Sequence, residues 1–451
     1  MENCRSKKNR VHIISLGCPK NLVDSEVMAS LLLKEGFRIV PSEEAADIIL
    51  VNTCAFILPA KEESIGEILR VAEYKKQGRC AHLVITGCLP QRYGAALGRE
   101  LPEVDLFMGP GEIPRIAAAV REMCAKPGAA RTFTGPPRFL MDASFDRILS
   151  APAFSAYLKI ADGCDNRCSY CVVPSVRGRF RSRMPADVLR EAERLARSGV
   201  KEIILTAQET TAYGRDLAGR PTLASLLEDL ASIGDLQWIR LLYTHPARIT
   251  TELLEVIARH ERICRYLDVP VQHIDDDILR SMGRRTTGEK IKRVIRRIRN
   301  IIPGCSLRTS FIVGFPGETK DSFARLHAFM RETRFDHLGV FTYSREEGTK
   351  AAGLPRQVRE ATKESRRHTI MVEQQKISRE INESLVGTAG EVLIEGPSND
   401  RRFRYRGRMR RQSPDIDGVT YVMARDRTPG DIVTCEIVDI TTYDLYAQEM
   451  R

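Results

Sequence analysis

Three cysteines lie close together in the segment DGCDNRCSYC, at Cys164, Cys168 and Cys171. Thiolates at this spacing repel one another and are reactive unless they share a metal. A structural zinc ion takes four ligands as a rule, and this segment contains no histidine. An iron–sulfur cluster is held by four cysteines as a rule, so three cysteines would leave one iron open to an outside ligand. We call these residues the loop set, and their spacing favours a cluster over the alternative of zinc.

Three further cysteines are far apart in the sequence but share one local setting. Cys18, Cys54 and Cys88 end the segments HIISLGC, IILVNTC and LVITGC, and each segment predicts a strand just before its cysteine. Because the carboxyl ends of parallel strands lie along one edge of a sheet, we expect these thiols, the strand-end set, to converge on a second cluster. The alternative is three separate buried cysteines. The remaining cysteines lack such a pattern and are predicted to be packing or surface thiols: Cys4, Cys80, Cys124, Cys264, Cys305 and Cys435.

The elements around the strand-end set alternate between strands and helices. Short apolar runs at residues 11–16, 48–51 and 83–86 predict strands, and apolar residues at helical spacing in 25–34 and 64–74 predict helices. This alternation predicts a parallel sheet with flanking helices, an α/β domain of flavodoxin-like type. We expect it to occupy residues 1–125.

A Pro- and Gly-rich stretch at residues 126–153 follows and predicts a linker or a small hairpin. Six strand–helix units come next, in residues 154–382, and they predict a partial (β/α)6 barrel with the loop set at its carboxyl-terminal mouth. The predicted barrel strands are residues 157–160, 202–206, 238–242, 266–271, 306–313 and 338–343. Residues 358–385 predict a polar helix that leads away from the barrel.

The last segment, residues 383–451, is rich in β-branched residues and turns, and it predicts a small antiparallel β-barrel. Three domains suit a chain of 451 residues at about 150 residues per domain. An apolar content of 43% excludes wholesale disorder. The net charge of +11 permits an anionic partner without requiring one. No apolar run approaches the roughly 18 residues of a membrane span, and the amino terminus is polar, so we expect a cytoplasmic protein without a membrane partner.

These features together resemble the methylthiotransferases of the radical S-adenosylmethionine superfamily, over nearly the whole chain. The resemblance rests on SLGCPKNLVDSE, VNTCAFI, ITGCLPQRY, GCDNRCSYCVVP and SFIVGFPGET, and on a last domain that resembles a TRAM domain, an OB-like barrel. It implies two [4Fe-4S] clusters, with the loop set holding the one that cleaves S-adenosylmethionine. The strand-end set would hold an auxiliary cluster that carries sulfur. One S-adenosylmethionine would then donate the methyl group, and a second would be the source of a 5′-deoxyadenosyl radical.

Two branches of this family differ in substrate. The segments YLDVPVQHIDDDILRSMGR and FDHLGVFTYSREEGTKAA resemble the branch that modifies the β-carbon of an aspartate in ribosomal protein uS12. The alternative is the branch that modifies N6-isopentenyladenosine in transfer RNA, which has a small Ser–Gly pair where this chain has His273. The resemblance implies the small ribosomal subunit as partner and a reductant such as flavodoxin or ferredoxin. A rival of another class is an RNA-binding protein whose metals are purely structural.

Contacts to S-adenosylmethionine are expected at the ends of barrel strands. We predict them at Tyr170, Gln208, Glu209, Gly314 and Gly317. The glycines of GFPGE permit close approach of a ligand, although a tight strand–helix turn with Glu318 opening the helix explains them equally well. At Glu209 the ribosomal-protein branch is expected to have aspartate. We assign no catalytic role to His245 or His273, and none beyond the cluster ligands elsewhere.

A basic stretch, RRFRYRGRMRR, occupies residues 401–411. Arginines alternate with apolar residues through most of it, and this period of two predicts a strand with one basic and one apolar face. Contact with phosphates of ribosomal RNA is one interpretation, and a solvated strand face is the other. Acidic residues outnumber basic ones in the last domain as a whole, which also suits a basic ribosomal protein as partner.

Overall fold

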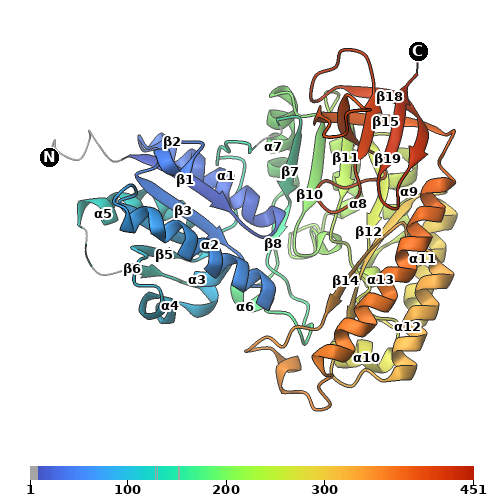
Figure 1. Ribbon diagram of the computed structural model, residues 1–451, viewed down its shortest axis with the longest axis horizontal. Helices are drawn as coiled ribbons and strands as arrows, with labels where there is room; N and C mark the ends of the chain where they lie inside the picture. The colour runs from blue at the N-terminus through green and yellow to red at the C-terminus, as the bar shows by residue number, and fades with distance from the viewer. Residues whose placement is uncertain (1–8, 127, 129–130, 151–152, 451) are drawn as a thin grey trace. The chain divides into compact units, whose positions relative to one another are not determined.

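The structure, a computed structural model, describes residues 9–126, 128, 131–150 and 153–450 (Figure 1). Cys4 therefore lies outside the described residues. The chain divides into two compact units. The first consists of Met1–Ala151, Lys159–Asn166 and Cys171–Val188, and the second of Pro152–Leu158, Arg167–Tyr170 and Leu189–Arg451. This division separates the cysteines of the loop set. Cys164 and Cys171 belong to the first unit, and Cys168 belongs to the second.

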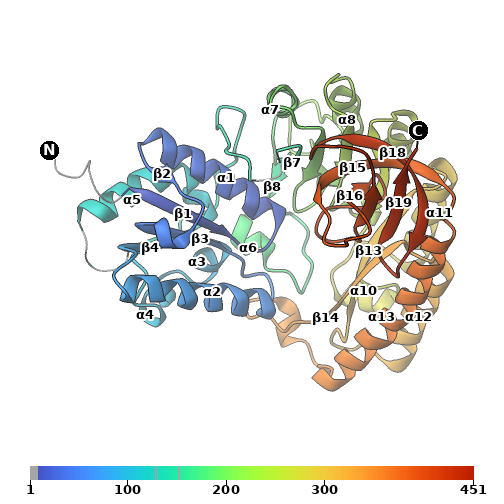
Figure 2. The same ribbon diagram turned by 45° about the horizontal axis from the view of Figure 1, so that its top comes forward.

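The first unit is built on a six-stranded sheet of order β2-β1-β3-β4-β5-β6, all of whose strand pairs are parallel. Its elements are β1 (Arg10–Ser15), α1 (Pro19–Lys34), β2 (Arg38–Ile39), β3 (Ile48–Thr53), α2 (Leu58–Lys76), β4 (His82–Gly87), α3 (Cys88–Tyr93), α4 (Ala95–Glu100), β5 (Leu106–Met108), α5 (Ile116–Ala125), β6 (Arg131–Phe133), β8 (Ala161–Asp162), α6 (Val173–Arg177) and β9 (Arg181–Ser182). Helices α1 and α5 cover one face of the sheet, and α2, α3 and α4 cover the other (Figure 2). The predicted parallel α/β domain is confirmed.

The three predicted strands of this sheet are β1, β3 and β4, each within a residue or two of its expected bounds. Strand β3 is buried along its whole length, as its continuous apolar run predicts for a central parallel strand. The region predicted as a linker contains β6, which pairs with β5 at the edge of the same sheet. That part of the linker prediction is therefore wrong, since these residues complete the first sheet.

The second unit contains an open six-stranded sheet of order β14-β13-β12-β11-β10-β7 and a closed five-stranded barrel of order β15-β16-β17-β19-β18. Its elements are β7 (Ser155–Lys159), α7 (Pro185–Arg197), β10 (Glu202–Thr206), α8 (Leu223–Ala231), β11 (Trp238–Leu241), α9 (Thr251–Arg259), β12 (Ile263–Asp268), α10 (Asp276–Ser281), α11 (Gly288–Ile301), β13 (Ser306–Val313), α12 (Lys320–Thr333), β14 (His337–Thr342), α13 (Glu360–Glu383), β15 (Ala389–Pro397), β16 (Tyr405–Met409), β17 (Thr420–Met423), β18 (Ile432–Ile440) and β19 (Leu445–Glu449). The first residues of α7 and the last of β7 belong to the first unit.

The strands β10 to β14 pair in parallel, and helices lie between successive strands along the chain. This arrangement confirms the predicted six strand–helix units of an open barrel. The outer helix α11 buries Ile291, Ile295 and Ile298 and leaves most of its basic residues exposed, as its amphipathic pattern predicts. The described residues include no helix that is both long enough and apolar enough to cross a membrane.

The small C-terminal barrel docks on the amino-terminal ends of the parallel strands. Arg408 of β16 forms an ion pair of 2.6 Å with Glu202, the first residue of β10, and both side chains are almost fully buried. Arg240 of β11 donates to the same carboxylate at 2.8 Å. Burial alone would raise the pKa of Glu202, but the two guanidinium groups outweigh it and lower that pKa to about 2. The docking leaves the opposite, carboxyl-terminal edge of the sheet to the predicted site residues.

The basic stretch 401–411 is divided between this docking contact and the surface. Arg408 is buried and Arg411 pairs with Asp336 at 2.7 Å, whereas Arg406 is exposed. The prediction of one continuous basic face is therefore wrong for the second half of the stretch. A period of two places Arg406 and Arg408 on one face of a strand, but that face meets acidic residues of the same unit at Arg408.

Candidate functional site

The strand-end set converges at the carboxyl edge of the first sheet. Cys18 caps the amino terminus of α1, Cys54 follows β3, and Cys88 is the first residue of α3. Burial, together with the electrostatic effect of Cys88 and Cys18, raises the pKa of the Cys54 thiol to about 12. The structure therefore places all three cysteines at the carboxyl ends of the neighbouring strands β1, β3 and β4, as the sequence predicts, and their part as cluster ligands stays a prediction. Cys54 is buried, while the other two are only partly so.

Close approach at this edge depends on a glycine and an asparagine. Gly17 has a φ of +87°, and a Cβ there would lie 2.6 Å from the Cβ of Cys54. Any larger residue would therefore push Cys54 away from Cys18. The Asn21 side chain donates to the carbonyls of Leu16 and Thr53, both at 3.0 Å, and so fixes the ends of β1 and β3 relative to each other.

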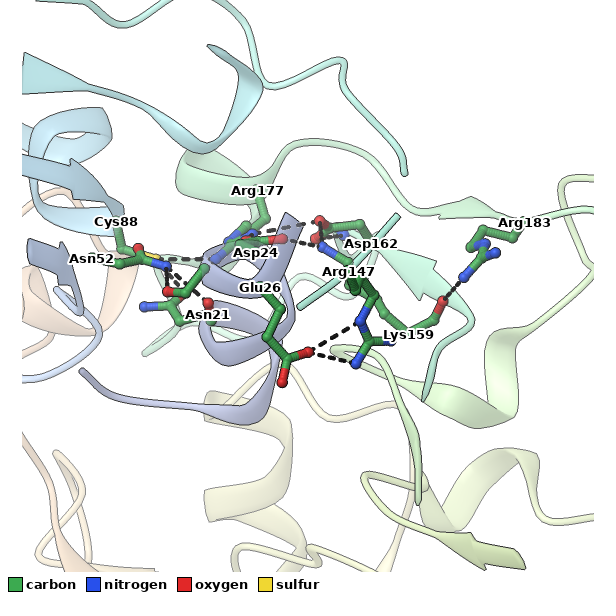
Figure 3. Close-up of polar contacts among 12 residues, drawn as sticks. Asn21, Asp24, Glu26, Asn52, Cys88, Arg147, Lys159, Asp162, Arg177 and Arg183 are labelled. Carbon is green, nitrogen blue, oxygen red and sulfur yellow. Dashed lines mark hydrogen bonds and ion pairs between the residues drawn. The ribbon is translucent and has the colours of Figure 1, made fainter. Parts of the chain in front are cut away.

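A buried arginine lies beside the strand-end set. Arg177 Nη2 lies 3.8 Å from Cys88 Sγ, and it also donates to Asn21 Oδ1 (Figure 3). Its Nη1 donates to Asp24 Oδ2 at 2.6 Å. Burial raises the pKa of the Cys88 thiol, and the positive charge of Arg177 opposes that increase. Arg177 thus favours the thiolate form, which is the form that binds a metal.

The loop set is described separately in the two units. In the first unit the Cys164 N–H donates to the Gly178 carbonyl at 3.1 Å. In the second unit Cys168 forms a side-chain hydrogen bond with the buried Arg284, whose Nη2 also donates to the Pro270 carbonyl at 2.5 Å. A cationic donor therefore accompanies one cysteine of each set.

The predicted contacts after β10, Gln208 and Glu209, lie at the carboxyl end of that strand. Glu209 is buried, and its carboxylate pairs with Arg248 at 2.5 Å and accepts from Thr211 Oγ1 at 3.1 Å. Its charge is therefore already balanced within the protein. Gln208 is partly buried at the same edge. Both positions remain predicted ligand contacts.

The GFPGE loop after β13 is shaped by contacts within the protein. Gly314 has a φ of +72°, and a Cβ there would lie 2.2 Å from the side chain of Lys363 in α13. Its N–H donates to Glu318 Oε2 at 2.8 Å, and Thr319, not Glu318, caps α12. The turn interpretation accounts for Gly314, and its contact with S-adenosylmethionine stays a prediction. Gly317, with only the Arg356 guanidinium nearby at 3.7 Å, keeps room for a ligand.

The ring of Tyr170 packs edge-on against Phe315 of this loop, with ring centroids 6.4 Å apart. The two histidines of the same edge are buried, as expected for structural residues. Burial lowers the pKa of His245 to about 2, with help from the charges of Arg284 and Arg248, so His245 is neutral. His273 Nδ1 accepts from the Asp275 N–H at 3.0 Å.

The strand-end set does not have the spacing of a site for a single ion. Within the described part of the chain, no three His, Cys, Asp or Glu side chains are grouped closely enough to hold one metal ion. A four-iron cluster bonds each cysteine to a different iron and so needs wider spacing. Three thiols at the ends of neighbouring strands, with a cationic donor beside Cys88, fit such a cluster at the strand-end set. The assignment of the six cysteines as ligands remains a prediction.

Three family models match the chain, one for each predicted domain. Residues 158–330 match the Radical SAM superfamily, residues 10–109 match the uncharacterized protein family UPF0004, and residues 386–449 match the TRAM domain. The TRAM match coincides with the closed barrel β15–β19. The superfamily match includes the loop set, and the UPF0004 match includes the strand-end set.

Curated relatives extend over almost the whole chain. The "Ribosomal protein uS12 methylthiotransferase RimO" of Syntrophus aciditrophicus is 59% identical over 446 residues, covering 98% of both chains. This chain belongs to the uS12 methylthiotransferase family. Relatives of the same name from Geobacter sulfurreducens and Pelotomaculum thermopropionicum are each 50% identical and cover 98% and 97% of this chain and 98% of their own chains. The family consists of radical S-adenosylmethionine transferases, so the chain is an enzyme of the transferase class.

Solved structures with the same fold are more distant than these uS12 methylthiotransferase relatives. The radical S-adenosylmethionine methyltransferase TsrM from Kitasatospora setae has a TM-score of 0.53 at 17% identity, covering 74% of this chain and 72% of its own. The cobalamin-dependent S-adenosylmethionine radical enzyme OxsB has a TM-score of 0.52 at 14% identity, covering 83% and 56%. At these identities the similarity concerns the fold alone. It supports the radical S-adenosylmethionine architecture that the sequence predicts.

Two arginines at the site had no sequence signal of their own. Arg177 lies in VRGRFRSR and Arg284 in SMGRR, where basic residues in polar loops usually indicate solvent exposure. Both are buried, and both donate toward a cysteine of one of the two sets. Only the position of Arg177 shortly after the last cysteine of the loop set could have drawn attention to it.

Proposed function

We propose that this enzyme transfers a methylthio group to the β-carbon of an aspartate in ribosomal protein uS12. The observation that carries the proposal is the full-length similarity to relatives named as uS12 methylthiotransferases, together with the strand-end set at the carboxyl edge of the first sheet. The transfer-RNA alternative has no comparable support, because all three of the relatives named above are uS12 methylthiotransferases.

The chemistry divides between two [4Fe-4S] clusters. When bound, they would supply an electron that splits S-adenosylmethionine to a 5′-deoxyadenosyl radical, at the loop set, and a sulfur for transfer, at the strand-end set. A radical this reactive is needed because the aspartate β-carbon carries an unactivated C–H bond. The protein itself would supply six thiolate ligands, leave one iron of each cluster open to an outside ligand, and exclude water from the radical.

Individual side chains have distinct parts in this task. Arg284 is proposed to orient Cys168 by a hydrogen bond. Gln208 and Gly317 lie at the same strand ends and are proposed to contact S-adenosylmethionine. Glu209, neutralised by Arg248, is proposed to orient hydroxyl groups of the ligand and not to balance a positive charge.

The proposed partners are the small ribosomal subunit, through uS12, and a flavodoxin or ferredoxin as reductant. Contact with ribosomal RNA is confined to the exposed part of the basic stretch. There the Arg402 guanidinium lies 5.1 Å from the ring centroid of Tyr446, which is stacked against Tyr421 with centroids 5.2 Å apart. Arginine next to stacked aromatic rings suits unpaired bases and phosphates.

Mass spectrometry of a strain that lacks the gene tests the substrate. We expect uS12 from this strain to lose the mass of one methylthio group on one aspartate, and transfer RNA to be unchanged. Restoring the gene returns the mass, and a plasmid that encodes the Cys168→Ala protein serves as the matched control that does not. Loss of 2-methylthioadenosine from transfer RNA, with uS12 unchanged, contradicts the proposal.

A further inference from the structure

A buried network of four charged residues begins beside the strand-end set. Arg177, Asp24, Lys159 and Asp162 all have side chains that are at most 7% exposed. Arg177 Nη1 lies 2.6 Å from Asp24 and 3.5 Å from Asp162, and Lys159 bridges the same two carboxylates from the other side (Figure 3). With two cations and two anions, these four side chains together carry no net charge.

Arg177 connects this network to a cysteine. Its Nη2 points toward Cys88 Sγ at 3.8 Å, and the side-chain oxygen Oδ1 of Asn21, to which it also donates, lies 3.9 Å from the same sulfur. A guanidinium group keeps its charge at every accessible pH. Because the group is buried, solvent and salt screen this charge only weakly. The cysteine therefore has a permanent positive charge at hydrogen-bond distance.

The other end of the network reaches the segment of the loop set. Asp162 ends β8, and its Oδ1 accepts from the N–H of Gly163, the residue before Cys164. The Cys164 N–H in turn donates to the carbonyl of Gly178, the residue after Arg177. One continuous chain of hydrogen bonds and ion pairs thus connects Cys88 of one set to the backbone at Cys164 of the other.

We propose that Arg177 is a positioning residue for the auxiliary cluster, which it orients through Cys88 and whose reduction potential it raises by its buried charge. The proposal rests on the proposed function, because it requires a cluster at the strand-end set. Hydrogen bonds to the sulfurs and local net charge both set the potential of an iron–sulfur cluster. Removing Arg177 would leave a net charge of −1 in the network, which opposes the addition of an electron. Removing the charge of Asp24 would have the opposite effect.

The test uses the full-length chain with Cys164, Cys168 and Cys171 all replaced by alanine, so that the remaining cluster is the auxiliary one. After anaerobic loading with iron and sulfide, its midpoint potential is measured by a redox titration followed by electron paramagnetic resonance. We expect Arg177→Gln to shift the potential to a more negative value and Asp24→Asn to shift it to a more positive one. Arg177→Lys, which keeps the charge but not the forked donor, is expected to shift it less than Arg177→Gln.

The matched control is Arg147→Gln. Arg147 forms an equally buried pair of 2.6 Å with Glu26, which lies on helix α1 like Asp24, and the contacts drawn in Figure 3 join Arg147 to Glu26 and not to Cys88. Its removal should lower stability without moving the potential. Equal potentials in the Arg177→Gln and Arg147→Gln proteins would overturn the proposal. If the Arg177→Gln protein holds no cluster, the sign of the Asp24→Asn shift decides, and a shift that is absent or negative overturns it.

Failure of the two-cluster part of the proposed function gives a different result. In that case the parent protein without the loop set takes up no iron–sulfur cluster at all, whatever residue stands at position 177. If the parent protein takes up a cluster but the Arg177→Gln and Asp24→Asn changes leave its potential unchanged, the proposed function stands. Only the part assigned to Arg177 is then overturned.

Discussion

Replacing Cys168 with alanine is expected to abolish the formation of 5′-deoxyadenosine from S-adenosylmethionine. The change removes a proposed cluster ligand, whose neighbour Arg284 would then be left without its sulfur partner. Removing a group that only orients a metal ligand lowers metal affinity or activity by about 10–100-fold. Removing a ligand itself should therefore lower the formation of 5′-deoxyadenosine by more than about 100-fold. The measurement is 5′-deoxyadenosine per chain in anaerobic, reduced protein, quantified by chromatography.

The matched control is Cys305→Ala, which removes a buried thiol in the same unit. This thiol lies next to the start of β13, at the opposite end of that strand from the predicted site, and its loss should leave the rate unchanged. A Cys168→Ala protein that cleaves S-adenosylmethionine at the normal rate would show that the loop set does not hold the radical-generating cluster.

Replacing Cys54 with alanine is expected to separate the two halves of the reaction. S-adenosylmethionine cleavage should continue, because the loop set is intact. The methylthio product on uS12 should fall below detection, because the auxiliary cluster loses its most buried proposed ligand. Mass spectrometry of a uS12 substrate and chromatography of 5′-deoxyadenosine in the same samples measure both halves at once.

Cys80→Ala is the control for this second prediction. Cys80 is a buried thiol of the same sheet domain, and its sulfur contacts only backbone carbonyls among the hydrogen bonds described, those of Asp47 and His82. We expect that variant to form product normally. Normal product formation by the Cys54→Ala protein, in contrast, would mean that the strand-end set has no part in sulfur transfer.

Much of the fold follows from patterns of short range. Strands β10 (Glu202–Thr206) and β13 (Ser306–Val313) have the predicted bounds, because each is a β-branched run between turn residues. Convergence of Cys18, Cys54 and Cys88 followed from one topological rule, since the carboxyl ends of parallel strands share an edge.

Other features depend on partners that are distant in sequence. Strand β6 has only three residues, and its pairing with β5 alone makes it a strand. Arg408 belongs to a pattern that indicates a solvated face. In the structure it is buried, because it forms an ion pair with Glu202 of the preceding domain. Arg177 finds its partners at positions 24 and 88, so that no local pattern distinguishes it from a surface arginine.

The iron and acid-labile sulfide content of intact, oxygen-protected protein tests the central claim most directly. The account predicts about eight iron atoms and about eight sulfides per chain, as for two four-iron clusters. The Cys168→Ala and Cys54→Ala proteins would each retain about half of both. A content of about four, or zinc in place of iron, would contradict the account, because one of the two cysteine sets would then have no cluster with which to act.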